Sequence, residues 1–255
     1  MNNAPVRTVS DAKRDFYTHH TRPINSIYRR VVDELLVEMH LLSVNADFAY
    51  NPIYALGVVT TFDRFMEGYQ PEADKTSIFS GLCHSVGSTP EQYRSDADAM
   101  KAAVAGLSLD QLKAEFEHLG DANPGQTLKH TLATVAAKEN FKYSRPFGVG
   151  LYTLVEAVAD PELLKDREAV EALFKELSGQ LNFSADKLQK DLELYRSNLE
   201  KFAQAQEVMK DMLAADRKKR EDRLKAAEAQ ANAEAAPEPV VTPAGEAPET
   251  EDQAN

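Results

Sequence analysis

The longest stretch without a helix breaker limits most strongly what this chain can fold into. From Ala185 to about Ala235 there is neither proline nor glycine. At about 1.5 Å per residue, this stretch permits one helix of roughly 50 residues, about 75 Å long. Apolar residues recur in it at alternating steps of four and three, a heptad pattern typical of coiled coils. The seam positions are Leu188, Leu192, Tyr195, Leu199, Phe202, Gln206, Met209 and Leu213.

The seam turns polar at Asp216 and Arg220. We expect the first half of the helix to pack on the body of the protein in preference to another chain, because an amphipathic helix must bury its apolar stripe. The second half, rich in alanine and charge pairs, is expected to project into water. Residues 236–255 contain four prolines, five acidic residues and no basic residue. This composition predicts a disordered acidic tail.

The most regular apolar pattern lies between Thr21 and Phe48 and predicts a helix to about Val44. Pro23 would stand in its first turn, where proline is tolerated. With little polar surface, this helix is predicted to lie at the centre of the core. Its two apolar sets are Ile24, Ile27, Val31, Leu35, Met39 and Leu42, and Tyr28, Val32 and Leu36.

Helix signals dominate the rest of the chain and strand signals are scarce. Cap residues, prolines and glycines divide it into helices. Their expected ranges are 8–20, 51–68, 74–86, 89–106, 108–120, 127–138 and 146–158, with two short helices from 160 and 166 and an end near Gly179 and Asn182. The fold class is therefore all-α: a multi-helix globular body (1–183), a long coiled-coil-like arm (184–235) and the tail (236–255).

Composition excludes several functions. A formal charge of −12 argues against binding to the nucleic-acid backbone, which requires clustered lysine and arginine. The single cysteine, Cys83, makes no internal disulfide and is expected to be a small buried residue. No run of about 18 apolar residues predicts a membrane span, and the N-terminus has no signal-peptide core.

Motifs for chemistry are missing from the sequence. It contains no nucleotide-binding glycine loop, zinc-binding HExxH or CxxC, or nucleophile elbow. Glu34, Glu38 and His40 come nearest to a metal site, but a helical di-iron site needs Glu-x-x-His spacing. We therefore predict no catalytic, metal or cofactor-binding residues, with a metal-dependent helical enzyme kept as a rival. The pattern is typical of a binding or scaffold protein.

Two surface features could contact partners. The basic run from Arg217 to Arg220 could touch anionic lipid, although the acidic pair after it favours a solvated face. Arginine and tyrosine are frequent anchors of protein interfaces. Their alternative is pairing within the chain, with Asp33, Asp47, Asp63 and Glu67. The candidates for partner binding are Arg22, Arg29, Arg30, Tyr50, Arg64, Tyr143 and Arg145.

Three stretches carry a resemblance to a known family: TRPINSIYRRVVDELLVEMHLLSVNADF, the NPIYALGVVTTFDRFMEGYQPEADKTSIFSGLC that follows it, and KENFKYSRPFGVGLYTLVE. Together they resemble the thylakoid formation protein family of cyanobacteria and chloroplasts. The match runs from about Thr8 to about Phe202, and without a transit peptide the chain is similar to the cyanobacterial form.

The resemblance implies a non-enzymatic accessory factor in photosystem II biogenesis and repair and in thylakoid organisation. It implies binding and stabilisation of FtsH-type membrane protease complexes. The alternative is an assembly chaperone that binds photosystem II subunits directly. The expected location is the cyanobacterial cytoplasm, peripherally on the thylakoid membrane. The sequence leaves self-association, the binding surface and the mode of membrane attachment open.

Overall fold

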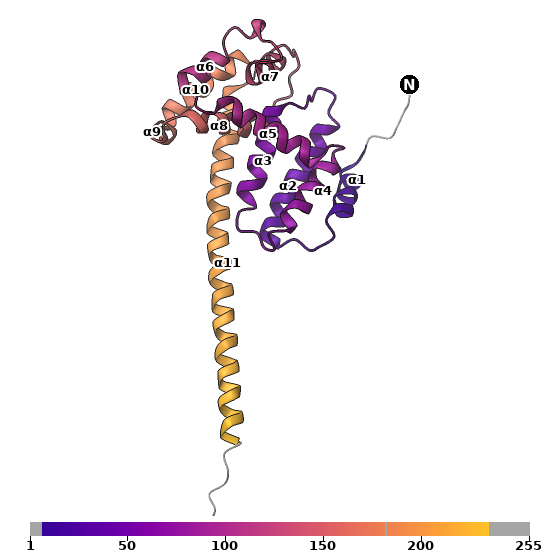
Figure 1. The fold of residues 1–255 in the computed structure, drawn as a ribbon, viewed down its shortest axis with the longest axis vertical. Helices are drawn as coiled ribbons and strands as arrows, with labels where there is room; N and C mark the ends of the chain where they lie inside the picture. The colour runs from indigo at the N-terminus through magenta and orange to yellow at the C-terminus, as the bar shows by residue number, and fades with distance from the viewer. Residues whose placement is uncertain (1–6, 182, 235–255) are drawn as a thin grey trace, which may run out of the picture. The chain divides into compact units, whose positions relative to one another are not determined.

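The computed structural model of this protein describes residues 7–181 and 183–234, the last seven of them without side chains. Within these residues the secondary structure is helical, with no strand, so the all-α prediction is confirmed (Figure 1). The helices are α1 (Val9–His19), α2 (Ser26–Ser43), α3 (Pro52–Phe65), α4 (Asp74–Ser85), α5 (Pro90–Val104), α6 (Leu109–Glu115), the 3-10 helix η1 (Leu119–Asp121), α7 (Thr127–Ala136), α8 (Arg145–Val158), α9 (Pro161–Lys165), α10 (Arg167–Gln180) and α11 (Ala185–Glu234).

The chain divides into two compact units, 1–205 and 206–255. The first unit holds α1 to α10 together with residues 185–205 of α11, and the second holds the remainder of α11. The predicted long helix without proline or glycine is therefore observed. The predicted acidic tail, 236–255, lies outside the described residues.

Helix α3 lies at the centre of the first unit. It packs against α8, α5 and α2, and every residue from Ile53 to Thr60 is buried. The prediction that the preceding helix is the central one is wrong: α2 buries one face and leaves Arg29, Arg30 and Leu41 exposed. The more deeply buried of its two apolar sets is the second one, because Tyr28, Val32 and Leu36 are all buried, whereas Ile24, Ile27 and Val31 of the first set are half-buried.

Two glycines let α3 and α8 approach closely. A Cβ atom on Gly57 would lie 1.6 Å from the carbonyl oxygen of Pro146, and one on Gly150 would lie 2.0 Å from that of Ile53. Any side chain at either position would collide with the backbone of the opposite helix. The two helices can therefore pack backbone to backbone only because both positions lack a side chain.

The helix starts follow the predicted caps. Thr8 and Asp11 form a capping box at α1, and Ser108 and Gln111 form one at α6. The Asn51 side chain accepts a hydrogen bond from the Tyr54 amide before Pro52 enters the first turn of α3. Gly87 ends α4 with a φ of 77°, a left-handed conformation that glycine adopts without steric strain.

Three predicted boundaries differ from the structure. Helix α2 begins at Ser26 with Asn25 as its N-cap, so Pro23 precedes the helix instead of entering its first turn. Helix α6 ends at Glu115, five residues early, because His118 takes a left-handed φ of 51° before η1. Helix α3 ends at Phe65, three residues before the predicted Gly68, whereas α10 ends at Gln180, between Gly179 and Asn182, as predicted.

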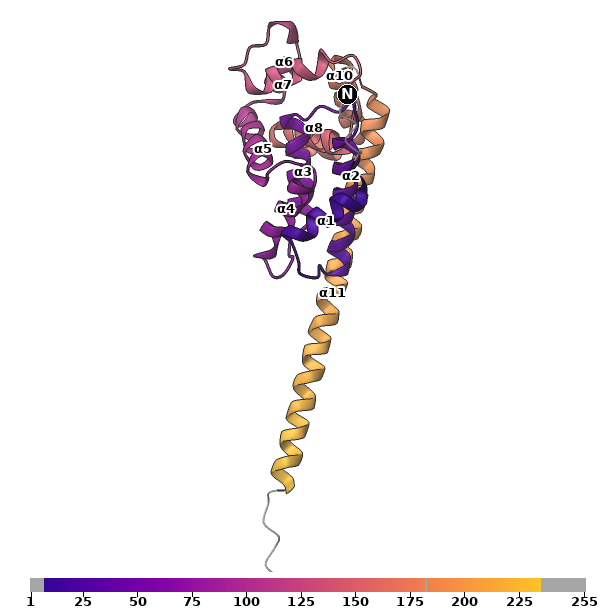
Figure 2. The same cartoon turned by 90° about the vertical axis from the view of Figure 1, so that its right-hand side faces the viewer.

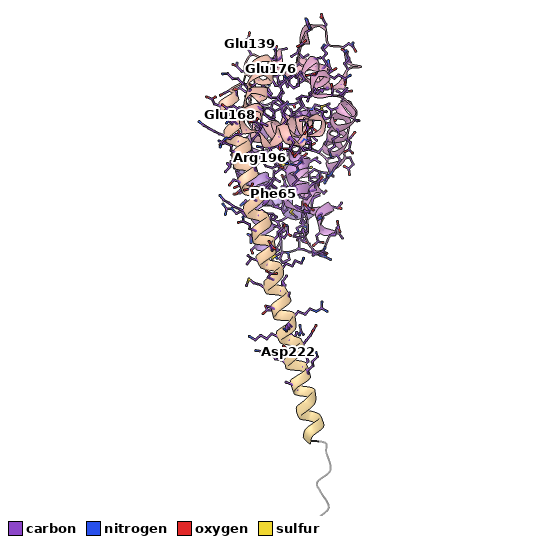
Figure 3. All side chains as sticks on the ribbon, turned by 90° about the vertical axis from the view of Figure 1, so that its left-hand side faces the viewer. Phe65, Glu139, Glu168, Glu176, Arg196 and Asp222 are labelled. Atoms are coloured by element: carbon purple, nitrogen blue, oxygen red, sulfur yellow. The ribbon has the colours of Figure 1, made fainter. Side chains whose placement is uncertain are left out.

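Residues 185–205 of α11 pack on the body. Leu188, Leu192 and Tyr195 are buried, and Tyr195 forms a cluster with Phe65 and Val149 against which Leu199 and Phe202 are half-buried. Arg196, labelled in Figure 3, lies with its guanidinium 4.7 Å from the centre of the Tyr152 ring of α8. The first five seam positions thus dock on this chain, as the sequence favoured.

The later seam positions belong to the second unit. Gln206 and Met209 are partly buried, and Leu213 is 62% exposed. Three other apolar side chains of this part, Val208, Met212 and Leu224, are also exposed. A coiled coil formed by this part of the seam stays a prediction.

Candidate functional site

A cleft forms where α2, the start of α8 and residues 185–205 of α11 meet, and we call it the α2–α11 cleft. Helices α2 and α11 lie side by side (Figure 2). They run in opposite directions: Tyr28 near the start of α2 has its ring 5.2 Å from that of Phe202, whereas Leu41 and Leu42 near its end share a hollow with Lys187 and Leu194.

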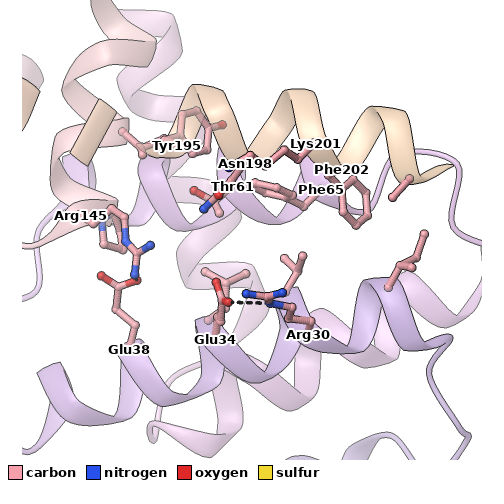
Figure 4. A pocket seen from close by; sticks show the side chains of 16 residues that line it. Arg30, Glu34, Glu38, Thr61, Phe65, Arg145, Tyr195, Asn198, Lys201 and Phe202 are labelled. Carbon is pink, nitrogen blue, oxygen red and sulfur yellow. Dashed lines mark hydrogen bonds and ion pairs between the residues drawn. The ribbon is translucent and has the colours of Figure 1, made fainter. Parts of the chain in front are cut away.

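The cleft has two hollows. The inner cavity, about 430 Å³, is floored by Thr61 and Phe65 of α3 and closed by Tyr195 and Phe202 of α11 (Figure 4). The outer groove, about 950 Å³, lies farther along α2 toward Leu41 and is more open to solvent. Both hollows are lined by the same four charged residues, Arg30, Glu34, Glu38 and Arg145.

Ion pairs order these charges. Ser144 caps α8 by accepting a hydrogen bond from the Phe147 amide, which fixes the first turn of the helix and directs Arg145 toward α2. The Arg145 guanidinium lies 3.2 Å from the Glu38 carboxylate, and Arg30 lies 3.3 Å from Glu34 one turn along α2. Burial raises the pKa of Glu38, and Arg145 opposes that rise.

Tyr143 forms the wall at the α8 end of the cleft. Its ring stacks on Phe183 at 5.2 Å between centroids, and the Lys187 ammonium lies 5.0 Å from the ring centre. Burial, and after it the Asp191 carboxylate, raise the pKa of the hydroxyl well above its usual value. The side chain is therefore neutral at physiological pH and serves as a packing surface that also attracts a cation.

The seven predicted partner-binding residues do not form one surface. Arg29, Arg30, Tyr143 and Arg145 surround the α2–α11 cleft, while the other three lie apart from it. Arg22 pairs with Asp74 of α4 at 3.0 Å. Tyr50 donates a hydrogen bond to Asp96 of α5 at 2.7 Å. Arg64 pairs with Glu156 of α8.

Pairing within the chain follows the expected acids only in part. Arg29 does pair with Asp33, at 3.7 Å. Asp63 instead pairs with Arg94 of α5, and Lys138 donates to the backbone carbonyl of Asp47. In the later part of α11, Arg217 of the basic run pairs with Glu221 at 3.0 Å.

Two leucines of the outer groove were missed by the sequence reasoning. Leu41 is 56% exposed and Leu194 is 47% exposed, and both line the groove. Leu194 falls between the seam positions Leu192 and Tyr195, on the polar side of the heptad. An apolar residue off the seam was the signal that could have identified it.

The other residues that could carry chemistry are buried in the core or form ion pairs. Cys83 is fully buried, and burial raises the pKa of its thiol to about 12. His40 is buried, while Glu34 and Glu38 face arginines. Among residues 7–181 and 183–227, no three acidic, histidine or cysteine side chains converge on a point that a metal ion could occupy.

The described helices also include none that combines the length and apolarity needed to cross a bilayer. The fold and the cleft define a class: an all-α protein with a cleft lined by both charged and apolar side chains.

The family follows from sequence comparison. Residues 8–224 match the profile of a family described as thylakoid formation protein. The chain is 57% identical over 218 residues to protein Thf1 of Trichormus variabilis, covering 86% of this chain and 93% of that one. Protein Thf1 of Nostoc punctiforme is 56% identical over 223 residues, covering 88% and 94%. This chain belongs to the thylakoid formation protein family.

A solved structure agrees with the fold. The solved structure of Psb29 at 1.55 Å resembles this one with a TM-score of 0.73 and 44% identity, over 84% of this chain and 98% of the other. The family resemblance seen in the sequence is thereby confirmed, and the relatives named here are cyanobacterial.

Proposed function

We propose that this protein is a non-enzymatic accessory factor of photosystem II biogenesis and repair and of thylakoid membrane organisation. In this role it binds an FtsH-type membrane protease complex and stabilises it. Family membership and the name Psb29 of the similar structure support the pathway. The protein reaches the protease complex from the surface of the thylakoid membrane.

The outer groove is the observation that carries this proposal. It exposes two leucines, Leu41 and Leu194, on facing helices. Arginine and lysine side chains, those of Arg29 and Lys187, frame them. An apolar centre with a charged rim is the usual composition of a protein interface, and its centre supplies most of the binding energy.

Co-purification from gently solubilised thylakoid membranes tests the proposal. Tagged protein should bring down protease subunits in near-stoichiometric amounts. The double variant Leu41→Glu/Leu194→Glu should lose them, since two charges would be buried in the contact. Leu224→Glu, an equally exposed leucine of α11 outside the groove, is the matched control and should retain them.

The other outcomes are equally informative. Recovery of photosystem II subunits without protease would reject the protease partner and favour the direct chaperone. Equal recovery of protease by the double variant and by wild type would show that the groove is not the contact.

A further inference from the structure

The inner cavity of the α2–α11 cleft has the size and composition of a small-molecule site. Its volume of about 430 Å³ falls within the roughly 300–1,000 Å³ of ligand pockets in proteins. Side chains of α2, α3, α8 and α11 line it (Figure 4). The cavity is distinct from the outer groove because its own floor comes from α3.

Most of the wall is apolar. Val31 and Leu35 of α2, Phe65 of α3, Val149 of α8 and Phe202 of α11 line it. The Phe65 and Phe202 rings lie edge to face with centroids 5.4 Å apart, which fixes both of them as a rigid aromatic wall. In Figure 4 these two rings lie together below α11, facing the space above α2. Such a wall favours a ligand with an apolar body.

The charges at the cavity do not balance. Its two carboxylates each have an arginine: Glu34 pairs with Arg30, and Glu38 pairs with Arg145. The third cation, Lys201 of α11, lines the same cavity. Lys201 is exposed, and none of the ion pairs found among the described residues includes it. One positive charge is left without a protein counterion, in a chain whose net charge is −12.

Neutral polar groups accompany that lysine. Asn198 lies one turn before it on α11, and Thr61 faces the cavity from α3. An amide and a hydroxyl can both donate hydrogen bonds to an oxyanion. Lys201, Asn198 and Thr61 therefore suit a negatively charged head group, while the aromatic wall of Phe65 and Phe202 suits the apolar chain of the ligand.

We infer that the inner cavity binds a single-chain anionic amphiphile, of the long-chain carboxylate class. The chain lies against Phe65, Val149 and Phe202, and the head group pairs with Lys201 at the opening. This inference does not depend on a protease partner, because the ligand is held by this chain alone.

The test measures binding of two soluble amphiphiles of equal chain length and opposite charge to the purified full-length protein. Decanoate and decyltrimethylammonium are titrated by calorimetry at concentrations that do not form micelles. Decanoate should bind saturably with one site per chain, at least about tenfold more tightly than the cation, and should raise the unfolding temperature.

Variants locate the site. Lys201→Glu should weaken decanoate binding about tenfold or more, because it replaces attraction by repulsion. Lys190→Glu, at an exposed lysine of the same helix that lines neither hollow, should leave it unchanged. Ala205→Trp places a large side chain at the exposed edge of the cavity and should abolish binding. Asn198→Trp is a second obstructing variant, and circular dichroism verifies that each variant is folded.

Three results would overturn the inference. The first is no saturable binding of decanoate by wild type. The second is equal or tighter binding of the cationic amphiphile, which would show that Glu34 and Glu38 dominate the cavity. The third is unchanged decanoate binding in folded Ala205→Trp and Asn198→Trp, which would place the amphiphile elsewhere on the protein.

Discussion

Helices α2 and α3 follow one another in the chain, are both strongly apolar, and yet occupy different environments. Helix α3 is buried from Ile53 to Thr60 between α8, α5 and α2. Helix α2 buries one face only, and its opposite side carries Arg29, Arg30 and the exposed Leu41. The regular apolar periodicity of α2 made it the predicted centre of the core.

The contrast teaches that regular apolar spacing identifies one buried face of a helix. Glycines that let a second helix approach closely identify a helix that is buried on all sides. Helix α3 contains Gly57 at its contact with α8, and α8 contributes Gly150 to the same contact. Close backbone approach leaves no side of α3 exposed between Ile53 and Thr60. Helix α2 lacks such a contact and keeps an outer face that is free to form the cleft.

Leucine truncation should separate the two helices most clearly. Leu56→Ala on α3 removes a fully buried side chain and should cost about 3–4 kcal/mol of unfolding free energy. Leu41→Ala on α2, at a 56% exposed position, should change it by less than about 0.5 kcal/mol. Urea unfolding measures both, and similar losses would contradict the assignment of α3 as the centre.

Gly57→Ala tests the close approach of α3 and α8. The new Cβ atom would lie 1.6 Å from the Pro146 carbonyl, so the helices must separate, at a cost of about 2–3 kcal/mol. Gly179→Ala is the matched control in α10, where nothing lies within 4 Å of the new atom. It should stabilise the protein by about 0.5–1 kcal/mol. A neutral Gly57→Ala in chemical denaturation would refute the contact.

The pH dependence of stability should reveal the half-buried side of α2. Burial raises the pKa of Glu38 above its usual 4.5, so the folded state holds the proton more tightly than the unfolded state. Stability from this group is therefore greatest at low pH and falls as pH rises from about 4.5 through the raised pKa.

Glu38→Gln removes this ionisation and gives the matching measurement. The unfolding free energy of the variant minus that of wild type should increase between pH 4 and pH 7, because only wild type loses stability as Glu38 ionises. Leaving Arg145 unpaired adds a cost that is the same at every pH and does not alter this trend. Thermal unfolding at a series of pH values follows the difference. A difference that moves in the opposite direction would show that Arg145, and not burial, dominates the titration of Glu38.

The smallest effect is expected on the outer face of α2. The Arg30 side chain is 84% exposed, and its pair with Glu34 is a surface one, so Arg30→Ala should cost less than about 0.5 kcal/mol. A loss above about 1 kcal/mol in urea unfolding would mean that this face is structural, and would weaken its assignment to partner binding.

Part of the candidate site could be predicted from the sequence. Arg29, Arg30, Tyr143 and Arg145 were singled out by residue type, and the structure places all four around the cleft. The same reasoning also selected Arg22, Tyr50 and Arg64, which pair elsewhere. Residue type indicates that a side chain can anchor a contact, but it carries no information about which anchors share a surface.

Leu194 and Lys201 show the converse: they belong to the cleft, but the sequence pattern did not single them out. Both lie on α11 between positions of the heptad seam, and the heptad pattern assigns them no contact. Their place in the cleft depends on which way the docked helix is turned relative to α2. That rotation is set by Phe202 and Tyr195 packing on Phe65 of α3.

The sequence by itself determined the helices and most of their starts. Intrahelical hydrogen bonds join residues four apart, and caps act within one turn, so Thr8, Asn51, Thr89 and Ser108 mark the starts of their helices locally. It also determined the long α11, because a run without proline or glycine has no local reason to break.

Only the tertiary structure decided which helix lies at the centre and where a cleft forms. The close approach of Gly57 to Pro146, and the pairing of Glu38 with Arg145, join residues about 90 and 107 positions apart. Such contacts depend on the shape and charge of two surfaces at once. The periodicity of either segment alone does not contain that information. The cleft could therefore be identified only from the packed structure.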